Sequence, residues 1–120
     1  MKGIVKRGLG QGEYWIKKLN PIFIEKNKME LFPGTLNIEI EEPYIIEDNY
    51  QIINGKEYGG TEEVLIKECV VLEEKAYIVR PKRNNAENGD HPLNIIEIIS
   101  NINFREKYKL RDNDRIEIKI

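Results

Sequence analysis

Two short glycine-containing segments hold residues whose types and spacing suit phosphate and metal chemistry. Residues 8–13 read Gly-Leu-Gly-Gln-Gly-Glu and follow a short apolar stretch. Glycines at alternating positions can adopt positive φ and let successive backbone N–H groups approach phosphate oxygens. Residues 33–37 read Pro-Gly-Thr-Leu-Asn, so Thr35 and Asn37 lie two apart at the start of a predicted strand and share one face. Because two neutral oxygens on one face suit Mg²⁺, the two segments predict a magnesium–nucleotide site.

Both segments also have structural explanations. A β-bulge or a turn would account for the glycines, and turn capping would account for Thr35 and Asn37. The glycine segment is not a Walker loop, because no Gly-Lys-Ser/Thr follows it, and its spacing does not fit a dinucleotide fingerprint. We interpret it as the loop of a strand–loop–strand unit with strands at residues 1–7 and 13–16.

Two charged residues stand out further along the chain. Glu97 interrupts the apolar run of residues 94–99, where a carboxylate is costly unless it has a partner or a task. We favour a functional role, the alternative being a place on the polar face of an alternating strand. Arg105 is the best candidate for a charged phosphate contact, and an ordinary salt bridge is its alternative role.

The remaining pattern is that of many short strands joined by tight turns. Asn54-Gly55 predicts a type I′ hairpin between strands at 50–53 and 56–58. Residues 81–92 form a polar loop long enough to act as a lid. Alternation and turn residues predict further strands at 36–40, 63–72, 75–79 and 115–120, a helical turn at 24–29 and a short helix at 103–109. This pattern is typical of a small closed barrel or a sandwich.

Composition limits the possible class of protein. The 120 residues fit one domain, 1–120, and Lys+Arg at 19 against Asp+Glu at 21 give a net charge of −2. A nucleic-acid binder needs a basic field, so we expect no nucleic-acid partner. Cys69 is the single cysteine, which excludes an internal disulfide and a zinc cluster. With no apolar stretch of about 20 residues, we expect a cytoplasmic protein without a membrane partner, and we take it to be a monomer.

The order of the motifs resembles the archaeal-type CTP-dependent riboflavin kinases over nearly the whole chain. The matching motifs are Gly-Leu-Gly-Gln-Gly-Glu, Gly-Thr-Leu-Asn, Arg80-Pro81-Lys82-Arg83, Ile-Ile-Glu-Ile-Ile, Phe104-Arg105-Glu106 and Asp112-Asn113-Asp114. The resemblance implies a mainly-β fold, a closed six-stranded cradle-loop barrel with one or two short helices. It also implies that CTP, with one Mg²⁺ ion bound alongside it, phosphorylates riboflavin to FMN and leaves CDP.

The resemblance further assigns roles to residues of this chain. It implies nucleotide contacts from Gly8, Leu9, Gly10, Gln11, Gly12 and Glu13, and from Ile102, Asn103, Phe104, Arg105, Glu106 and Lys107. It implies magnesium ligands at Thr35 and Asn37, and flavin contacts at Glu97 and Asn84, with Glu97 as the catalytic residue that accepts the ribityl proton.

The chain departs from the family pattern on the flavin side. Asn84 replaces a threonine, the loop through His91 is longer than expected, and Ser100-Asn101 replaces Ala-Pro. These departures leave two other interpretations open. The first is a non-catalytic nucleotide- or flavin-binding barrel, either a sensor or a transcription-factor-like module, and the second is a degenerate kinase that binds without turnover.

Overall fold

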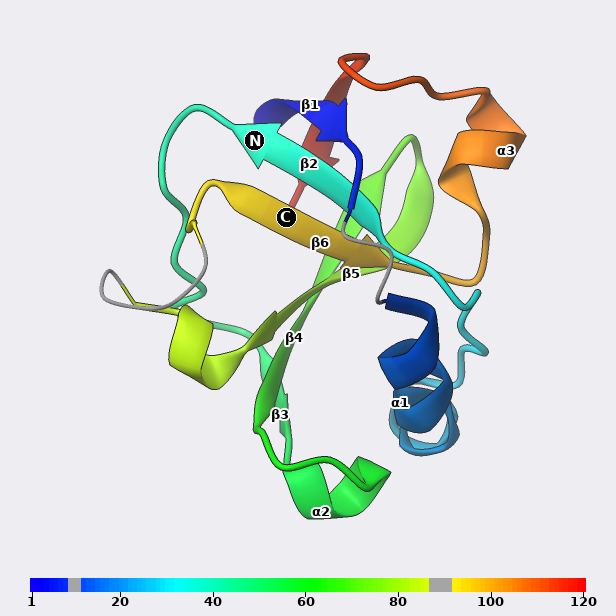
Figure 1. The fold of residues 1–120 in the computed structure, drawn as a ribbon, viewed down its shortest axis with the longest axis vertical. Coiled ribbons are helices and arrows are strands. Elements are labelled where there is room, and N and C mark those ends of the chain that lie inside the picture. Colours follow the sequence, from blue (N-terminus) through cyan, green and yellow to red (C-terminus); the bar gives the residue numbers. More distant parts are fainter. Residues whose placement is uncertain (9–11, 87–91) are drawn as a thin grey trace.

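The computed structural model describes residues 1–8, 12–86 and 92–120. Its elements, in chain order, are β1 (Lys2–Lys6), α1 (Gly12–Asn27), β2 (Leu36–Ile40), β3 (Gln51–Ile53), α2 (Gly55–Tyr58), β4 (Val64–Val71), β5 (Glu74–Pro81), a 3-10 turn (Lys82–Asn84), β6 (Ile95–Ile99), α3 (Phe104–Tyr108) and β7 (Arg115–Lys119). Figure 1 shows the strands curving around a common centre, with α1 lying beside them.

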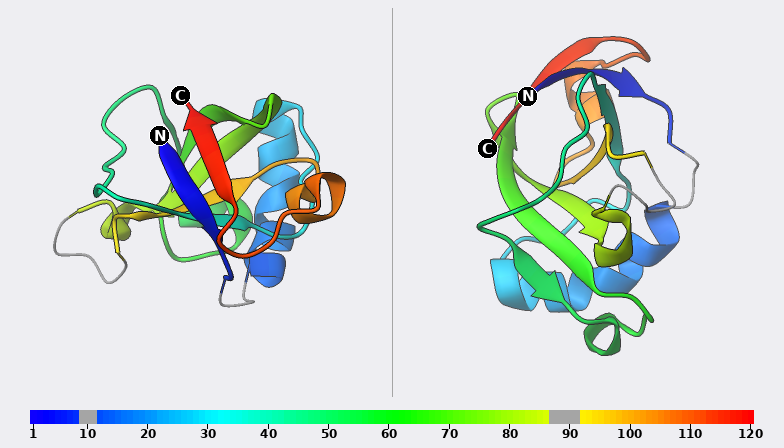
Figure 2. Two further views of the ribbon diagram at one scale, coloured as in Figure 1. Left: turned by 90° about the horizontal axis from the view of Figure 1, so that it is seen from above. Right: turned by 90° about the vertical axis from the view of Figure 1, so that its left-hand side faces the viewer.

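Six of the strands close into an antiparallel barrel. Hydrogen bonds join them in the order β4–β5–β6–β2–β1–β7, and β7 returns to pair with β4 at Val70 and Val71. β3 is the extra strand, paired with the opposite end of β4. Figure 2 shows the barrel from above and from one side. The prediction of a mainly-β, six-stranded closed barrel is therefore confirmed.

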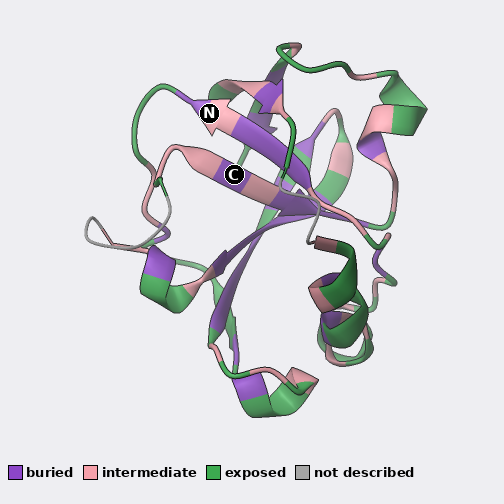
Figure 3. Ribbon diagram, in the orientation of Figure 1, coloured by how far each residue is buried: buried purple, intermediate pink, exposed green. Residues whose placement is uncertain are grey.

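Alternation along the strands separates two hydrophobic clusters. Ile38, Ile78 and Ile96 belong to the barrel interior. On the outer face, Tyr77 and Val79 pack with Ile16, Leu19 and Phe23 of α1. Phe23 meets Tyr77 edge-on, with ring centroids 4.9 Å apart. The helix thus covers one outer face of the barrel, and the residues on its opposite side are exposed (Figure 3).

The strand predicted at residues 13–16 is wrong, because these residues form the first turn of α1. Ile16, Leu19 and Phe23 recur at helical spacing and are all buried, so the apolar stripe facing the sheet decides the conformation. Glu13 in the first turn and Lys26 in the last also suit the helix dipole. The glycine segment therefore precedes a helix, and the predicted strand–loop–strand unit does not exist.

The hairpin predicted at Asn54-Gly55 is also wrong. Gly55 begins the short helix α2, and the Glu57 carboxylate accepts a hydrogen bond from the N–H of Asn54 at 2.8 Å. A two-residue hairpin turn occurs instead at Leu72 and Glu73, which join β4 to β5 with φ of 51° and 64°. Two successive positive φ values are those that a type I′ turn requires.

The other predicted elements agree with the structure to within a few residues. The strands at 36–40, 63–72, 75–79 and 115–120 correspond to β2, β4, β5 and β7, and the helix at 103–109 corresponds to α3. The helical turn at 24–29 overlaps the end of α1. Within the described part of the chain, none of the helices is both long enough and apolar enough to cross a bilayer.

Candidate functional site

A row of side chains crosses four neighbouring strands on the outer face of the barrel. The register places Lys6 opposite Asn37, Asn37 opposite Glu97, and Glu97 opposite Val79. Directly opposed residues have Cβ atoms about 4.5–5.5 Å apart. Glu97 alternates with Ile96 and Ile98, which face the barrel interior, so its carboxylate stands on the side that α1 partly covers. The pairing of β2 with β6 thereby brings a candidate metal ligand next to the candidate base.

A cavity of about 550 Å³ lies over this row. Gly12 and Trp15 line it from the start of α1, and Thr35 and Asn37 line it from the start of β2. Glu97 lines it from β6. Arg80, Asn84 and Pro92 complete the wall on the side of the long loop. Residues that the sequence assigns separately to the nucleotide, the metal and the flavin thus line one cavity.

Thr35 and Asn37 lie in direct contact at this cavity. The side-chain amide of Asn37 donates a hydrogen bond to Thr35 Oγ1 at 3.3 Å, and Asn37 is buried. Two neutral oxygen-bearing side chains fit a Mg²⁺ ion that keeps several waters and receives its negative ligands from phosphates. Among the described residues, no cluster of three or more His, Cys, Asp or Glu is arranged to hold a metal. A metal here would therefore depend on a bound nucleotide.

The glycine segment meets the metal candidates through close packing. A Cβ atom at Gly8 would overlap the Asn37 amide, and one at Gly12 would lie 3.3 Å from Thr35 Cγ2. Positive φ is not the reason for glycine at these two positions, since Gly59 is the one described glycine with positive φ. The prediction that these glycines are needed for positive φ is therefore wrong for Gly8 and Gly12. Glycine suits both positions because Asn37 and Thr35 pack where a side chain would lie.

The glycine segment has four other members, at positions 9, 10, 11 and 13. Leu9, Gly10 and Gln11 lie outside the described residues. Glu13 is exposed and forms an ion pair with Lys17, one turn further along α1, at 3.0 Å. Its carboxylate is thus engaged along the helix surface, and nucleotide contact by these four residues stays a prediction.

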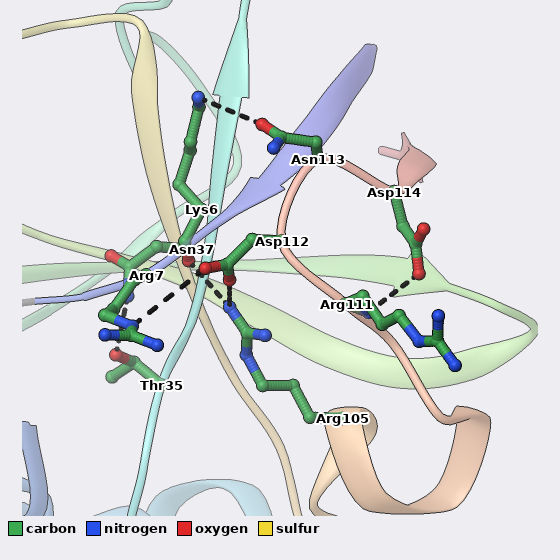
Figure 4. A network of polar contacts seen from close by, with 9 residues as sticks. All are labelled: Lys6, Arg7, Thr35, Asn37, Arg105, Arg111, Asp112, Asn113 and Asp114. Carbon is green, nitrogen blue, oxygen red and sulfur yellow. Dashed lines mark hydrogen bonds and ion pairs between the residues drawn. The ribbon is translucent and has the colours of Figure 1, made fainter.

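Positive charge collects at one edge of the cavity. Lys6 and Arg7 line the cavity, and Arg105 of α3 donates a hydrogen bond to the backbone carbonyl of Lys6 at 3.1 Å. Asp112 lies between the two guanidinium groups, 2.7 Å from Arg105 Nη2 and 3.9 Å from Arg7 Nε (Figure 4). The hydrogen bond from Arg105 holds the pKa of Asp112 below its ordinary value. Three cations against one carboxylate leave an edge suited to phosphate.

The other residues predicted on the α3 segment are placed differently. Ile102 and Phe104 pack against the barrel interior, and Asn103 caps α3 by accepting from the N–H of Glu106 at 3.2 Å. The ammonium of Lys107 pairs with Glu74 at 2.5 Å. Of the six residues predicted here, Arg105 is the one with a hydrogen bond to a residue that lines the cavity, through the backbone carbonyl of Lys6.

Asn84 is buried on the opposite side of the cavity. It ends the 3-10 turn that follows β5, and its Oδ1 is a buried atom without a hydrogen-bond partner. A buried unpaired acceptor is costly, so Asn84 Oδ1 is available to an N–H or O–H group of a ligand. His91 and the rest of residues 87–91, part of the predicted lid, lie outside the described residues.

Trp15, Tyr58 and Arg80 also line the cavity. The sequence predicts that one of Tyr14 and Trp15, which flank the glycine segment, packs inward and that the other can stack on a ring; it assigns no role to Tyr58 or Arg80. Trp15 is half-buried, whereas its neighbour Tyr14 is 69% exposed, so Trp15 is the one placed to stack on a ring. The phenol of Tyr58 donates to the Glu62 carbonyl at 2.8 Å, and burial raises its pKa. Helical spacing from Ile16 onward was the signal that would have placed Trp15. Tyr58 and Arg80 depend on tertiary contacts that the sequence does not display.

Comparison with known proteins identifies the family of this chain. The family model for a CTP-dependent riboflavin kinase, described as "Domain of unknown function DUF120", matches residues 5–120. A protein called riboflavin kinase from Methanocella arvoryzae is 32% identical over 98% of this chain and 55% of its own length. Proteins of the same name from Staphylothermus marinus and Methanothermobacter thermautotrophicus are 33% and 32% identical, covering 88% and 94% of their own lengths. The chain thus spans about half the length of some curated relatives and nearly all of others.

Proposed function

This chain belongs to the CTP-dependent riboflavin kinase family, and on that premise we propose that it transfers the γ-phosphoryl group of CTP to the ribityl 5′-hydroxyl of riboflavin, giving FMN and CDP. The observation that carries the proposal is the single cavity in which Thr35 and Asn37 face Glu97 and Asn84. A phosphoryl transfer needs its donor and acceptor aligned in one space. The name of the family supports CTP as the donor.

On the nucleotide side, the cations at the edge of the cavity would hold the phosphates. Lys6 and Arg7 line the cavity, and Arg105 is anchored beside them by the Lys6 carbonyl and Asp112. Preorganised cations stabilise the charge that is spread over the transferring phosphoryl group. Because Gly8 and Gly12 have no side chain, Asn37 and Thr35 pack directly against the backbone of the glycine segment, and this packing would hold both side chains in position for the phosphates and the metal.

Thr35 and Asn37 are the residues that would hold Mg²⁺, in company with the phosphates. When bound, the ion supplies a positive charge that neutralises phosphate oxygens. Thr35→Val and Asn37→Leu keep approximate volume while removing the oxygens. We expect both variants to lose Mg²⁺-dependent activity with a modest loss of stability, and normal FMN formation at a normal Mg²⁺ requirement in both would show that the ligand assignment is wrong.

On the flavin side, Glu97 would orient the ribityl hydroxyl and accept its proton. The 5′-oxygen forms a bond to the γ-phosphorus, the bond from that phosphorus to the β–γ bridging oxygen breaks, and the bridging oxygen leaves as part of CDP. The proton goes from the hydroxyl to the Glu97 carboxylate. Asn84 Oδ1 would accept a hydrogen bond from the flavin, and Trp15 would stack on an aromatic ring.

The test is direct and uses the protein as it stands. The protein is incubated with riboflavin, Mg²⁺ and CTP, ATP, GTP or UTP separately, and FMN is measured by chromatography. We expect FMN with CTP and little or none with the other three nucleotides. FMN from another nucleotide would overturn the choice of donor. Riboflavin or CDP binding without FMN from any nucleotide would favour the non-catalytic barrel instead.

A further inference from the structure

Arg80 is a buried cation at one end of the barrel. It is 5% exposed and lies on the same face of β5 as Ile78 and Ala76, both members of the interior cluster. Its guanidinium therefore lies on the interior face of the barrel, where a charge is costly unless it is well bonded. Arg80 is also one of the residues that line the cavity described above.

The guanidinium joins three segments that are distant in sequence. Its Nη1 donates to the carbonyl of Tyr44 at 2.5 Å and to Asn85 Oδ1 at 3.1 Å. Its Nη2 donates to the carbonyls of Leu93 and Ile95 at 3.3 and 3.4 Å. The link between β2 and β3, the turn after β5 and the start of β6 thus share one planar donor group.

Asn85 extends this network. Its side chain accepts from the N–H of Ile46 at 2.9 Å and donates to the carbonyl of Ile46 at 2.8 Å. The N–H of Tyr44 donates to the Leu93 carbonyl at 3.0 Å. The link between β2 and β3 is therefore fixed to both ends of the long loop through Arg80 and its immediate partners.

This network holds the irregular wall of the cavity. Asn84 precedes Asn85, and Ile95 and Glu97 lie on the strand that follows the loop; all three of Asn84, Ile95 and Glu97 line the cavity. The wall assigned to the nucleotide is built from regular strands and a helix, whereas the wall assigned to the flavin depends on side-chain hydrogen bonds to backbone carbonyls. A guanidinium suits this role because its rigid planar fork carries five N–H donors that reach acceptors on three segments, whereas an ammonium is a compact charge with three donors.

We propose that Arg80 is a positioning residue for riboflavin, which fixes Asn84 and Glu97 through the carbonyls and the amide that its guanidinium gathers. The inference rests on the proposed function, since it assigns this wall to the flavin. Arg80 acts through other residues and makes no bond to the reacting atoms. Its loss should therefore weaken riboflavin recognition and leave nucleotide recognition nearly unchanged.

Lys67 provides a matched control. It is also a buried cation, 4% exposed, and lies on the same face of β4 as Leu65 and Cys69 of the interior cluster. It donates to the carbonyl and the carboxylate of Asp48, at 2.5 and 3.0 Å, and so anchors the same link between β2 and β3. It does not line the cavity. Lys67→Met should therefore reproduce a general loss of stability without the effect on the flavin.

The experiment compares wild type, Arg80→Met, Arg80→Lys and Lys67→Met. For each protein we would measure the riboflavin Kd by quenching of flavin fluorescence, the KM values for riboflavin and CTP, and the melting temperature. We expect both Arg80 variants to raise the riboflavin Kd and KM by about 10- to 100-fold, as a misplaced support does, with the KM for CTP close to normal. We expect Lys67→Met to lower the melting temperature with both KM values close to normal.

The outcomes separate this inference from the proposed function. An unchanged riboflavin Kd in Arg80→Met overturns the inference, and so does an equal rise in Lys67→Met. If Arg80→Met does not fold, the riboflavin Kd of Arg80→Lys decides. Wild-type riboflavin affinity in Arg80→Lys would mean that a positive charge alone suffices, and the inference would be wrong. If the wild type binds riboflavin without making FMN, the proposed kinase activity fails, and the Kd comparison still decides the role of Arg80. If the wild type does not bind riboflavin, both fail.

Discussion

Replacing Gly8 by alanine tests whether room beside Asn37 is what the nucleotide site requires. A Cβ atom at Gly8 would overlap the Asn37 side-chain nitrogen, whereas one at Gly12 would lie 3.3 and 3.4 Å from Thr35 Cγ2 and Oγ1. Neither glycine has positive φ, so alanine introduces no backbone strain at either position. Gly8→Ala and Gly12→Ala are therefore the same chemical change against the two candidate metal ligands, with a severe overlap at Gly8 and only a tight contact at Gly12.

The loss of nucleotide affinity in Gly8→Ala can be estimated from the displacement of the Asn37 side chain. Asn37 is 8% exposed and donates to Thr35 Oγ1 at 3.3 Å. Turning its side chain about 30° from a rotamer costs ~0.5–1.5 kcal/mol, and losing the hydrogen bond costs ~0.5–1.5 kcal/mol. Together these give about 1–3 kcal/mol, which is about 5- to 150-fold in affinity for the nucleotide with Mg²⁺. Gly12→Ala should lose less affinity than Gly8→Ala, because a Cβ atom there lies 3.3 Å from Thr35 Cγ2 and needs only a small shift of that side chain.

Calorimetric titration of CDP, with and without Mg²⁺, measures both variants, and thermal denaturation checks their folding. We expect Gly8→Ala to lose most of the gain in affinity that Mg²⁺ gives to the wild type. Wild-type affinity in Gly8→Ala would refute the assignment of Asn37, since the clash cannot leave that side chain in place. Equal losses in the two variants would refute the steric argument.

Three further predictions concern single side chains. Glu97→Gln should lower kcat by about 100-fold if the carboxylate is a general base, with normal CDP binding by calorimetry; a wild-type kcat would reduce Glu97 to a strand residue. Cys69 is buried, and burial raises its pKa to about 12, so a thiol reagent at pH 8 should label it only after unfolding, and rapid labelling of the native protein would contradict its burial. Partners lower the pKa values of Asp112 and Glu74 in the folded state, chiefly hydrogen bonds from Arg105 and Lys107. Their stabilisation is present above their ordinary pKa values of 3.8 and 4.5 and is lost as pH falls through the lower folded values. Urea midpoints should therefore drop at acid pH, and less steeply in an Asp112→Asn, Glu74→Gln double variant.

Strands with clear alternation could be predicted from the sequence, and those whose conformation depends on distant contacts could not. Residues 36–40 and 115–120 alternate and form β2 and β7. Residues 13–16 have strand-forming types, but the apolar spacing that continues to Phe23 places them in α1, where three buried residues face the sheet. At Gly55, a Cβ atom would lie 2.7 Å from the Gly60 carbonyl, so close packing with the next turn replaces the expected hairpin.

The candidate site was predictable to the extent that its residues share a motif. Thr35 and Asn37 were identified by their spacing, and Glu97 by its apolar neighbours, and the structure places all three on one cavity. Arg80 could not be given a role, because its partners Tyr44 and Leu93 are 36 and 13 residues away in the chain. A single sequence does not show which carbonyls will be free at the end of a barrel.

The closure of the barrel by β7 sets an order of events during synthesis. β7 pairs with β1 on one side and with β4 on the other, and the N-terminal amine donates to the Ile118 carbonyl at 2.6 Å. Until residues 115–119 leave the ribosome, both β1 and β4 therefore present an open edge, and such edges are templates for association with other chains. The barrel can complete its hydrogen bonding only after β7 has been synthesised, because β7 pairs with β1 through residues such as Gly3 and Ile116, 113 positions apart in the chain. Closure is therefore a slow, non-local step.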